Sequence, residues 1–121
     1  MRLYLIYVTT RDKDEARAIG RHVVQSRLAA CVNIFVHMNS MYYWDDVFQD
    51  DQEAVLVAKT TEARVPELVE AIKQRHSYDC PCIVTLPIQD GNPAFLQWIA
   101  AQVSPADGLE AKDQSSRSNS D

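Results

Sequence analysis

The sequence predicts an α+β domain of the ferredoxin-like type, βαββαβ with a C-terminal helix and an antiparallel sheet. Segments with strand periodicity and segments with helical periodicity follow one another in that order over residues 1–103. A length of 121 residues suits one domain, and 46% apolar with 24% charged residues is the balance of a globular protein. Right-handed crossovers in both βαβ units then place two helices on one face of the sheet.

The first strand and the first helix are separated by a short polar segment. Residues 3–9 are apolar at successive positions, which is typical of a strand covered on both faces. Asp12 with Glu15 resembles the capping box that begins many helices. The helix is expected to continue to Leu28, because apolar residues recur at helical spacing at Ala16, Ile19, Val23 and Val24.

The second and third strands are predicted from alternating side chains. Alternation over residues 30–39 indicates a long strand, which the aromatic residues 41–44 extend. Two acidic pairs, at residues 45–46 and 50–51, are typical of turns. A third strand is therefore expected over residues 54–59.

The second half of the domain repeats the order of helix and strand. Helical spacing runs from Val65 to His76, and Pro66 is tolerated because it lies near the helix start. A fourth strand is predicted over residues 82–86, with Pro87 ending it.

A short helix and a polar segment complete the chain. Asn92 is a favourable N-cap, and Pro93 suits the first position of a helix that reaches Val103. Residues 104–121 are rich in Ser and Asp, and Leu109 is their single large aliphatic residue. Such a segment buries too little apolar surface to offset its ordering entropy. We therefore expect a folded domain over residues 1–103 and a disordered tail over residues 104–121.

Charge and cysteine content indicate the kind of partner and compartment. A net charge of −5 argues against binding to nucleic acid backbones or to an anionic membrane surface. The apolar run at residues 3–8 is too short for a signal-peptide core or a membrane span. Three cysteines do not suit a disulfide framework. We expect reduced thiols and a cytoplasmic location, with neither nucleic acid nor a membrane as a partner.

One face of the predicted sheet has no helix to cover its large apolar side chains. The aromatic residues 42–44 add to this surface, since alternation places them on both sides of the ribbon. Aromatic residues of this kind are frequent at permanent interfaces. A second subunit is the simplest cover, with packing inside one subunit as the alternative. The predicted interface residues are Tyr42, Tyr43 and Trp44.

Side chains that bind metals gather near the end of the second helix. Cys80 and Cys82 flank Pro81, which favours an extended backbone and so places both thiols on one side. His76 precedes them and could turn toward them. Two thiolates and an imidazole suit Cu(I) or Zn(II), so the predicted metal ligands are His76, Cys82 and Cys80. The alternative is that the cysteines only pack, as free cysteines commonly do.

The remaining cysteine, the acidic residues and the sequence motifs do not indicate a further binding or catalytic site. Cys31 is expected to be buried and inert, and the acidic residues 45–53 suit a solvated hairpin tip better than a calcium loop. The sequence has no glycine-rich phosphate loop, serine-nucleophile elbow or zinc-protease motif. A thiol–imidazole pair of Cys82 with His76 would lack an obvious oxyanion site, so an enzyme is not predicted.

Several blocks of the sequence resemble the CutA divalent-cation-tolerance proteins. They occur in order over nearly the whole predicted domain, which makes chance a poor explanation. The blocks are YVTT at residues 7–10, RLAACVN at 27–33, YYW at 42–44, KTT at 59–61, HSY at 76–78, LP at 86–87 and GNPAFLQW at 91–98.

The resemblance implies a ferredoxin-like subunit in a tight homotrimer, similar in architecture to the PII signalling proteins. It also implies binding of copper and other divalent cations and a role in metal tolerance, with no reaction and no organic cofactor. Ser77 stands where the family usually has Pro, and Cys82 stands where it usually has Glu. A thiol in place of a carboxylate is expected to shift the preference toward soft ions such as Cu(I) and Zn(II).

Two classes of function follow from these patterns. The first is a trimeric metal-binding protein, and the second is a PII-like binding module that holds a small ligand in the cleft between subunits. Lys59 and Thr60 end a strand beside such a cleft and suit an anionic group, and Tyr78 is the third candidate cleft residue.

Overall fold

The computed structural model describes residues 2–104, and it has the order of elements that the sequence predicts. These elements are β1 (Leu3–Thr10), α1 (Lys13–Gln25), β2 (Cys31–Trp44), β3 (Val47–Thr61), a short 3-10 helix (Glu62–Arg64), α2 (Val65–Arg75), β4 (Ile83–Ile88) and α3 (Pro93–Val103). The α+β prediction, βαββαβ with a C-terminal helix, is confirmed. The predicted tail beyond Ser104 lies outside the described residues.

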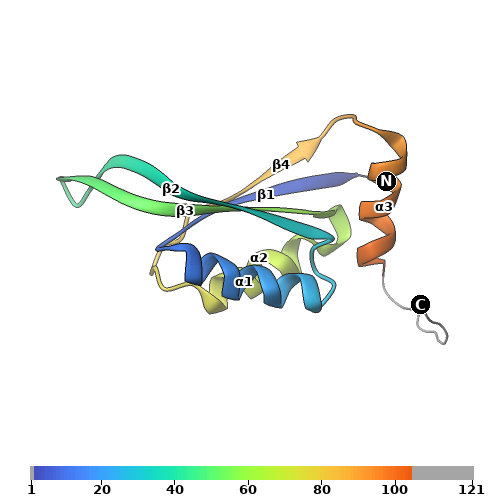
Figure 1. Ribbon diagram of the computed structural model, residues 1–121, viewed down its shortest axis with the longest axis horizontal. Helices are drawn as coiled ribbons and strands as arrows, with labels where there is room; N and C mark the ends of the chain where they lie inside the picture. Colours follow the sequence, from blue (N-terminus) through green and yellow to red (C-terminus); the bar gives the residue numbers. More distant parts are fainter. Residues whose placement is uncertain (1, 105–121) are drawn as a thin grey trace.

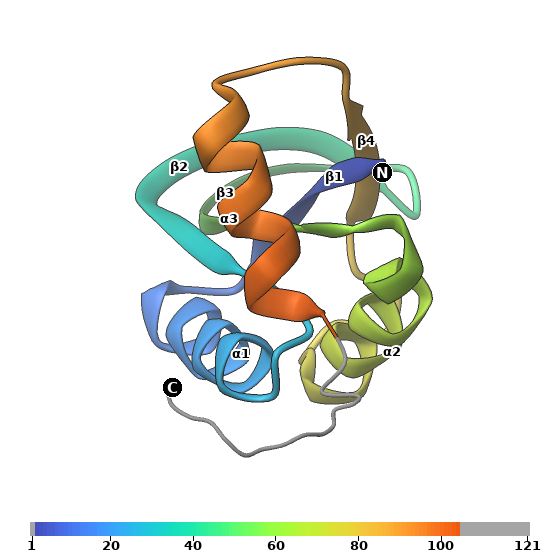
Figure 2. The same ribbon diagram turned by 90° about the vertical axis from the view of Figure 1, so that its right-hand side faces the viewer.

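All four strands form one antiparallel sheet in the order β2-β3-β1-β4. Helices α1 and α2 lie on one face of this sheet, and α3 lies across one end of it (Figure 1, Figure 2). No helix within residues 2–104 lies over the opposite face, which we call the open face (Figure 1).

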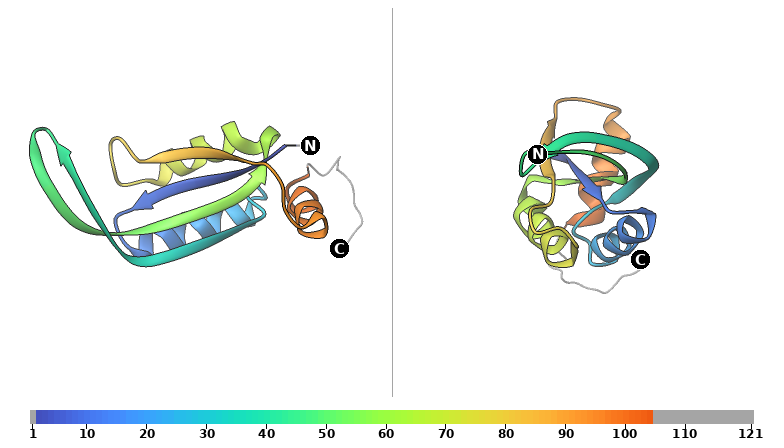
Figure 3. Two further views of the ribbon diagram at one scale, coloured as in Figure 1. Left: turned by 90° about the horizontal axis from the view of Figure 1, so that it is seen from above. Right: turned by 90° about the vertical axis from the view of Figure 1, so that its left-hand side faces the viewer.

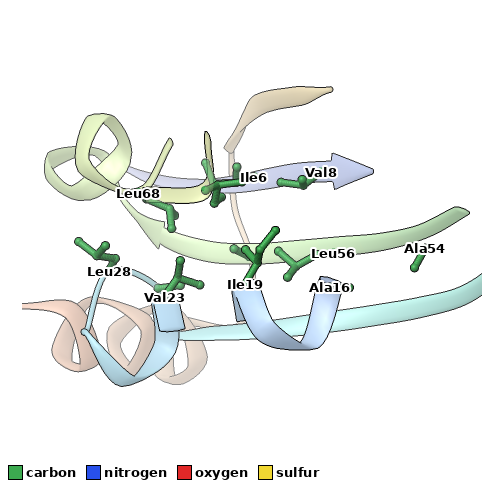
Figure 4. Packing of buried hydrophobic residues seen from close by; sticks show 12 residues of the cluster. Ile6, Val8, Ala16, Ile19, Val23, Leu28, Ala54, Leu56 and Leu68 are labelled. Carbon is green, nitrogen blue, oxygen red and sulfur yellow. The ribbon is translucent and has the colours of Figure 1, made fainter. Parts of the chain in front are cut away.

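The main core lies between the sheet and helices α1 and α2 (Figure 4). Gly20 allows α1 to approach the sheet closely: a Cβ atom there would lie 2.9 Å from Cγ2 of Val32 and 3.3 Å from Cδ1 of Leu56. A smaller cluster under α3 closes the end of the sheet. The core residues that are almost completely buried include Ile6, Val8, Ala16, Ile19, Val23, Leu56, Ala58, Leu68 and Ile72.

The predicted helix caps are present. Oδ1 of Asp12 accepts a 2.9 Å hydrogen bond from the backbone N–H of Glu15 at the start of α1. Oδ1 of Asn92 accepts one of 3.2 Å from the N–H of Ala94 at the start of α3. Helix α1 ends at Gln25, and Leu28 packs into the core from the segment that follows it.

Strands β2 and β3 continue past the helices as a long hairpin (Figure 1; Figure 3, left). Asp45 and Asp46 form its turn, with φ of 51° and 63°. The second predicted turn is wrong, because Asp50 and Asp51 lie inside β3 opposite Met41 and Ser40. The side chain of Asn39 binds Asp50, which helps β3 to extend back to Val47 instead of beginning near residue 54.

Strand β4 continues through Pro87, contrary to the sequence prediction. Pro87 pairs with Tyr4 of β1, and β1 is the one strand that β4 pairs with in the described part of the chain. An edge strand tolerates proline because the missing N–H can face away from the sheet.

Large apolar side chains remain exposed on the open face and the hairpin. On the open face, Phe35 is 58%, Val84 48% and Leu86 45% exposed. On the hairpin, Tyr43 is 73% and Trp44 55% exposed. The single chain therefore leaves the aromatic residues 42–44, which we call the aromatic ribbon, largely unburied. Packing within one subunit does not account for these side chains. Between residues 2 and 104, no helix has the length and apolar character that a membrane crossing requires.

Candidate functional site

A cleft of about 550 Å³ lies between the base of the hairpin and the segment that precedes β4. Its walls come from four places: β1, β2, β3 and residues 78–82. The lining contains three aromatic side chains, three carboxylates and two thiols, and none of these lining residues is Lys or Arg. The lining residues are Thr9, Ser40, Tyr42, Trp44, Asp51, Glu53, Tyr78, Asp79, Cys80 and Cys82.

A hydrogen bond between Tyr78 and Glu53 joins two walls of the cleft. The phenol of Tyr78 donates to Oε2 of Glu53 over 2.7 Å. Burial and then this hydrogen bond raise the pKa of Tyr78 well above its ordinary value of 10. Tyr78 is therefore a neutral donor at neutral pH. Glu53 is 8% exposed, and within residues 2–104 Tyr78 is its one side-chain hydrogen-bond partner.

The imidazole of His76 is held by hydrogen bonds at both ring nitrogens. Nδ1 accepts a 3.1 Å hydrogen bond from the backbone N–H of Tyr78, and Nε2 lies 2.7 Å from the carbonyl oxygen of Thr9. Since a carbonyl only accepts, the ring is assigned as the neutral tautomer with its proton on Nε2. Neither nitrogen has a free lone pair to offer a metal ion, which is not the arrangement that the sequence predicted.

Glu15 fixes the same segment from the start of α1. Its two carboxylate oxygens accept backbone hydrogen bonds, Oε1 from Arg11 at 2.8 Å and Oε2 from Ser77 at 2.7 Å. Burial alone would raise the pKa of Glu15, but these hydrogen bonds hold it below its ordinary value of 4.5. His76 and Glu15 thus support the segment that carries the cleft residues 78–82.

The two thiols Cys80 and Cys82 both line the cleft and are exposed. This placement is what Pro81 and an extended backbone predict. Among the described residues, however, no three His, Cys, Asp or Glu side chains come together as a group that could hold a metal ion. One chain therefore supplies two soft donor atoms beside carboxylates, and it does not supply a complete ligand set.

Lys59 and Thr60 do not lie at this cleft. Their side chains alternate across β3. Lys59 lies on the open face, where its amine donates to Oδ1 of Asn33 and lies 3.7 Å from Sγ of Cys31. Thr60 is buried on the other face and donates to the carbonyl oxygen of Leu28 over 2.7 Å. Cys31, predicted to be buried, is partly exposed beside this lysine.

The three predicted interface aromatics divide between two surfaces. Tyr42 and Trp44 line the cleft, and the hydroxyl of Tyr42 donates to Oδ2 of Asp51 over 3.0 Å. Tyr43 points to the other side, where its ring meets Phe48 edge-on with 5.6 Å between centroids. The cleft and the aromatic ribbon are therefore one continuous region of the molecule.

Sequence reasoning missed Glu53 as a cleft residue. The signal was its position directly before the apolar alternation of residues 54–58. Alternation places Glu53 on the same face as Val55 and Val57. A carboxylate on that largely apolar face calls for a partner, and Tyr78 is the partner.

The sequence model of one protein family, described as "CutA1 divalent ion tolerance protein", matches residues 4–102 of this chain. Among individual relatives, the "Divalent-cation tolerance protein CutA" of Thermus thermophilus is 41% identical over 95 residues, which are 78% of this chain and 92% of that protein. The "Protein CutA 1, chloroplastic" of Oryza sativa is 37% identical over 95 residues, also 78% of this chain. The chain spans 54% of the rice protein, about half its length.

Solved structures give the same match. The "Divalent cation tolerance protein (Cut A1)" of Thermus thermophilus superposes with a TM-score of 0.81 at 38% identity, covering 84% of this chain and 99% of that one. The "Periplasmic divalent cation tolerance protein CutA" of Archaeoglobus fulgidus gives a TM-score of 0.81 at 34% identity, with the same coverage. Sequence and fold thus match over the whole described domain.

Proposed function

Because the chain belongs to the CutA1 divalent ion tolerance protein family, we propose that it forms a homotrimer that binds copper or other divalent cations and acts in metal tolerance. Proteins of this family are not known enzymes, which agrees with the sequence analysis. We also propose a cytoplasmic site of action, although names of relatives include periplasmic and chloroplastic forms.

The observation that carries the metal proposal is the pair of thiols in the cleft. Cys80 and Cys82 are exposed, lie on either side of Pro81 and line the same cavity as Glu53. Two thiolates favour Cu(I) and Zn(II) over hard cations. His76 enters this proposal as the residue that positions the thiol segment, because both its nitrogens are already in hydrogen bonds.

The exposed apolar side chains of the hairpin and the open face support the trimer. Tyr43 and Trp44 of the hairpin and Phe35 of the open face are each more than half exposed, and surfaces of this kind favour burial against another chain. A neighbouring subunit over the ribbon would also border the cleft, since Tyr42 and Trp44 belong to both. Such a neighbour is the natural source of the metal ligands that one chain lacks.

The experiment titrates Cu(I) and Zn(II) into the assembled protein and into a Cys80→Ser/Cys82→Ser variant. We expect the variant to lose the specific site. Cys31→Ser is the matched control, because Cys31 lies beside Lys59 outside the cleft, and it is expected to bind as the wild type does. Equal binding curves for wild type and the double variant would rule out the thiol site. A monomer in light scattering would rule out the trimer.

A second candidate function is supported by the size of the cleft. A cavity of about 550 Å³ is far larger than one metal ion needs, and it suits a small organic molecule. In this function the protein is a PII-like module, with Tyr78 among the residues that hold the ligand. Native mass spectrometry of the purified assembly checks this, since a ligand that copurifies adds a defined mass.

A further inference from the structure

We propose that the cleft binds an organic ammonium ion, of which aliphatic diamines are the simplest members. This proposal rests on the second candidate function, a small ligand in the cleft, and names the chemical class of that ligand. It does not depend on the thiols Cys80 and Cys82.

The first argument is that the buried Glu53 has no cationic side-chain partner in the described part of the chain. Only 8% of the surface of this residue is exposed, and its Oε2 accepts a hydrogen bond from the phenol of Tyr78. Within residues 2–104, Oε1 has no hydrogen-bond donor and the carboxylate has no Lys, Arg or His partner. A buried carboxylate without a cation is costly, so a cationic ligand would be stabilised there.

The second argument is the aromatic lining. Tyr42, Trp44 and Tyr78 line the same cavity as Glu53. Ammonium groups are attracted to the faces of aromatic rings, and the methylene groups of an alkylamine pack against them. An alkylammonium ion can therefore use both the rings, through its methylene groups and its charge, and the carboxylate.

The spacing of the acidic groups also favours a longer cation over a single metal ion. The cleft contains carboxylates from β3 and from the segment before β4, yet no three donor side chains are gathered closely enough to hold a metal. Asp79 lines the cleft and is exposed, whereas Glu53 is buried. An amine at each end of a short chain would place one charge at Glu53 and the other at an exposed carboxylate.

An anionic ligand such as a nucleotide does not fit this lining. None of the lining residues is Lys or Arg, and Asp51, Glu53 and Asp79 would repel phosphate. Lys59 lies six residues further along β3 and is engaged with Asn33. The lining of this cleft therefore favours a cation, and Lys59 and Thr60, which the sequence predicts for a cleft between subunits, lie outside it.

The experiment measures putrescine binding to the full-length assembled protein by calorimetry. Butylamine, neutral butanediol and ATP are the comparison probes. We expect putrescine to bind more tightly than butylamine does. Butanediol and ATP should show no binding, and added salt should weaken the binding of putrescine. Putrescine binding no stronger than that of butanediol, or binding of ATP alone, would overturn the proposal.

Two variants test whether putrescine binds at Glu53. Glu53→Gln keeps the shape and the acceptor for Tyr78 but removes the charge, and we expect putrescine affinity to fall by about tenfold or more. Glu62→Gln, an exposed glutamate outside the cleft, is the matched control and should bind as the wild type does. Equal affinity of both variants would overturn the site.

Further measurements separate this proposal from the others. If Glu53→Gln fails to fold, Asp79→Asn replaces it, with a smaller expected loss of about threefold because that carboxylate is exposed. The variant Cys80→Ser/Cys82→Ser is expected to keep putrescine binding while losing the metal. Failure of the metal site and failure of the amine site therefore give different results.

Discussion

Nε2 of His76 lies 2.7 Å from the carbonyl oxygen of Thr9, so the segment before β4 is tied to the end of β1. The other ring nitrogen accepts the N–H of Tyr78, which turns that phenol toward Glu53. Both nitrogens of the ring are therefore engaged in hydrogen bonds that shape the cleft. A metal ion on His76 would have to displace one of these two hydrogen bonds, so metal binding and support of the segment compete.

Two substitutions of His76 separate its roles. In His76→Gln the side-chain amide can still reach Thr9, and in His76→Asn the amide oxygen can still accept from Tyr78. Each variant loses one hydrogen bond, and we expect each to lose about 1 kcal/mol of unfolding free energy. Chemical denaturation measures this, and metal titration of the same variants should show the metal still bound. Loss of metal binding in both variants would instead make His76 a ligand.

Acid is expected to weaken the attachment of the cleft segment through Glu15. The pKa of Glu15 is lowered in the folded protein, so its stabilising contribution is fully present above its ordinary value of 4.5 and is lost as the pH falls through the lowered pKa. Glu15→Gln should therefore lower the thermal midpoint most near neutral pH, and the gap to wild type should close in acid. Asp14→Asn, exposed in the same helical turn, is the control and should show no such closing gap.

The order of strands and helices was predictable because each element carries its own local signal. Asp12 and Asn92 cap helices by bonds that span only two or three residues, and those bonds are present. Pro87 and the pair Asp50–Asp51 were misread for the opposite reason. Whether a proline or an acidic pair interrupts a strand depends on the strand beside it, here β1 for Pro87 and the Asn39 side chain of β2 for Asp50.

The cleft was only partly predictable because its walls come from distant parts of the chain. The side on which Cys80 and Cys82 lie followed from Pro81, which acts locally. The hydrogen bonds of His76 to Thr9 and of Tyr78 to Glu53 join residues 67 and 25 positions apart. No local pattern reports such pairings. Lys59 and Thr60 were placed together as neighbours in sequence, although strand alternation sends their side chains to opposite faces.

Close packing at Gly20 predicts the effect of a single methyl group. A Cβ atom there would lie 2.9 Å from Cγ2 of Val32, which is closer than side chains tolerate, so Gly20→Ala should lower the unfolding free energy by about 1–2 kcal/mol despite alanine's better helix propensity. Val32→Ala removes the obstructing methyl group. The double variant should therefore lose less than the sum of the two single losses, by about 0.5 kcal/mol or more. Strict additivity in chemical denaturation would contradict a clash at this contact.

The hairpin residue Trp44 tests the proposed trimer most directly. Its side chain is 55% exposed in one subunit, so a monomer would lose little when it is removed. If the neighbouring subunit covers it, Trp44→Ala should weaken assembly by about 3–5 kcal/mol, because a large aromatic side chain is removed from a buried contact. Light scattering over a dilution series measures this, with circular dichroism to verify that the subunit stays folded. Trp44→Phe keeps most of the aromatic area and should assemble at concentrations at which Trp44→Ala has dissociated. A wild-type trimer that Trp44→Ala leaves intact at every dilution would exclude the hairpin from the interface and leave the open face around Phe35 and Leu86 as the surface that holds the subunits together.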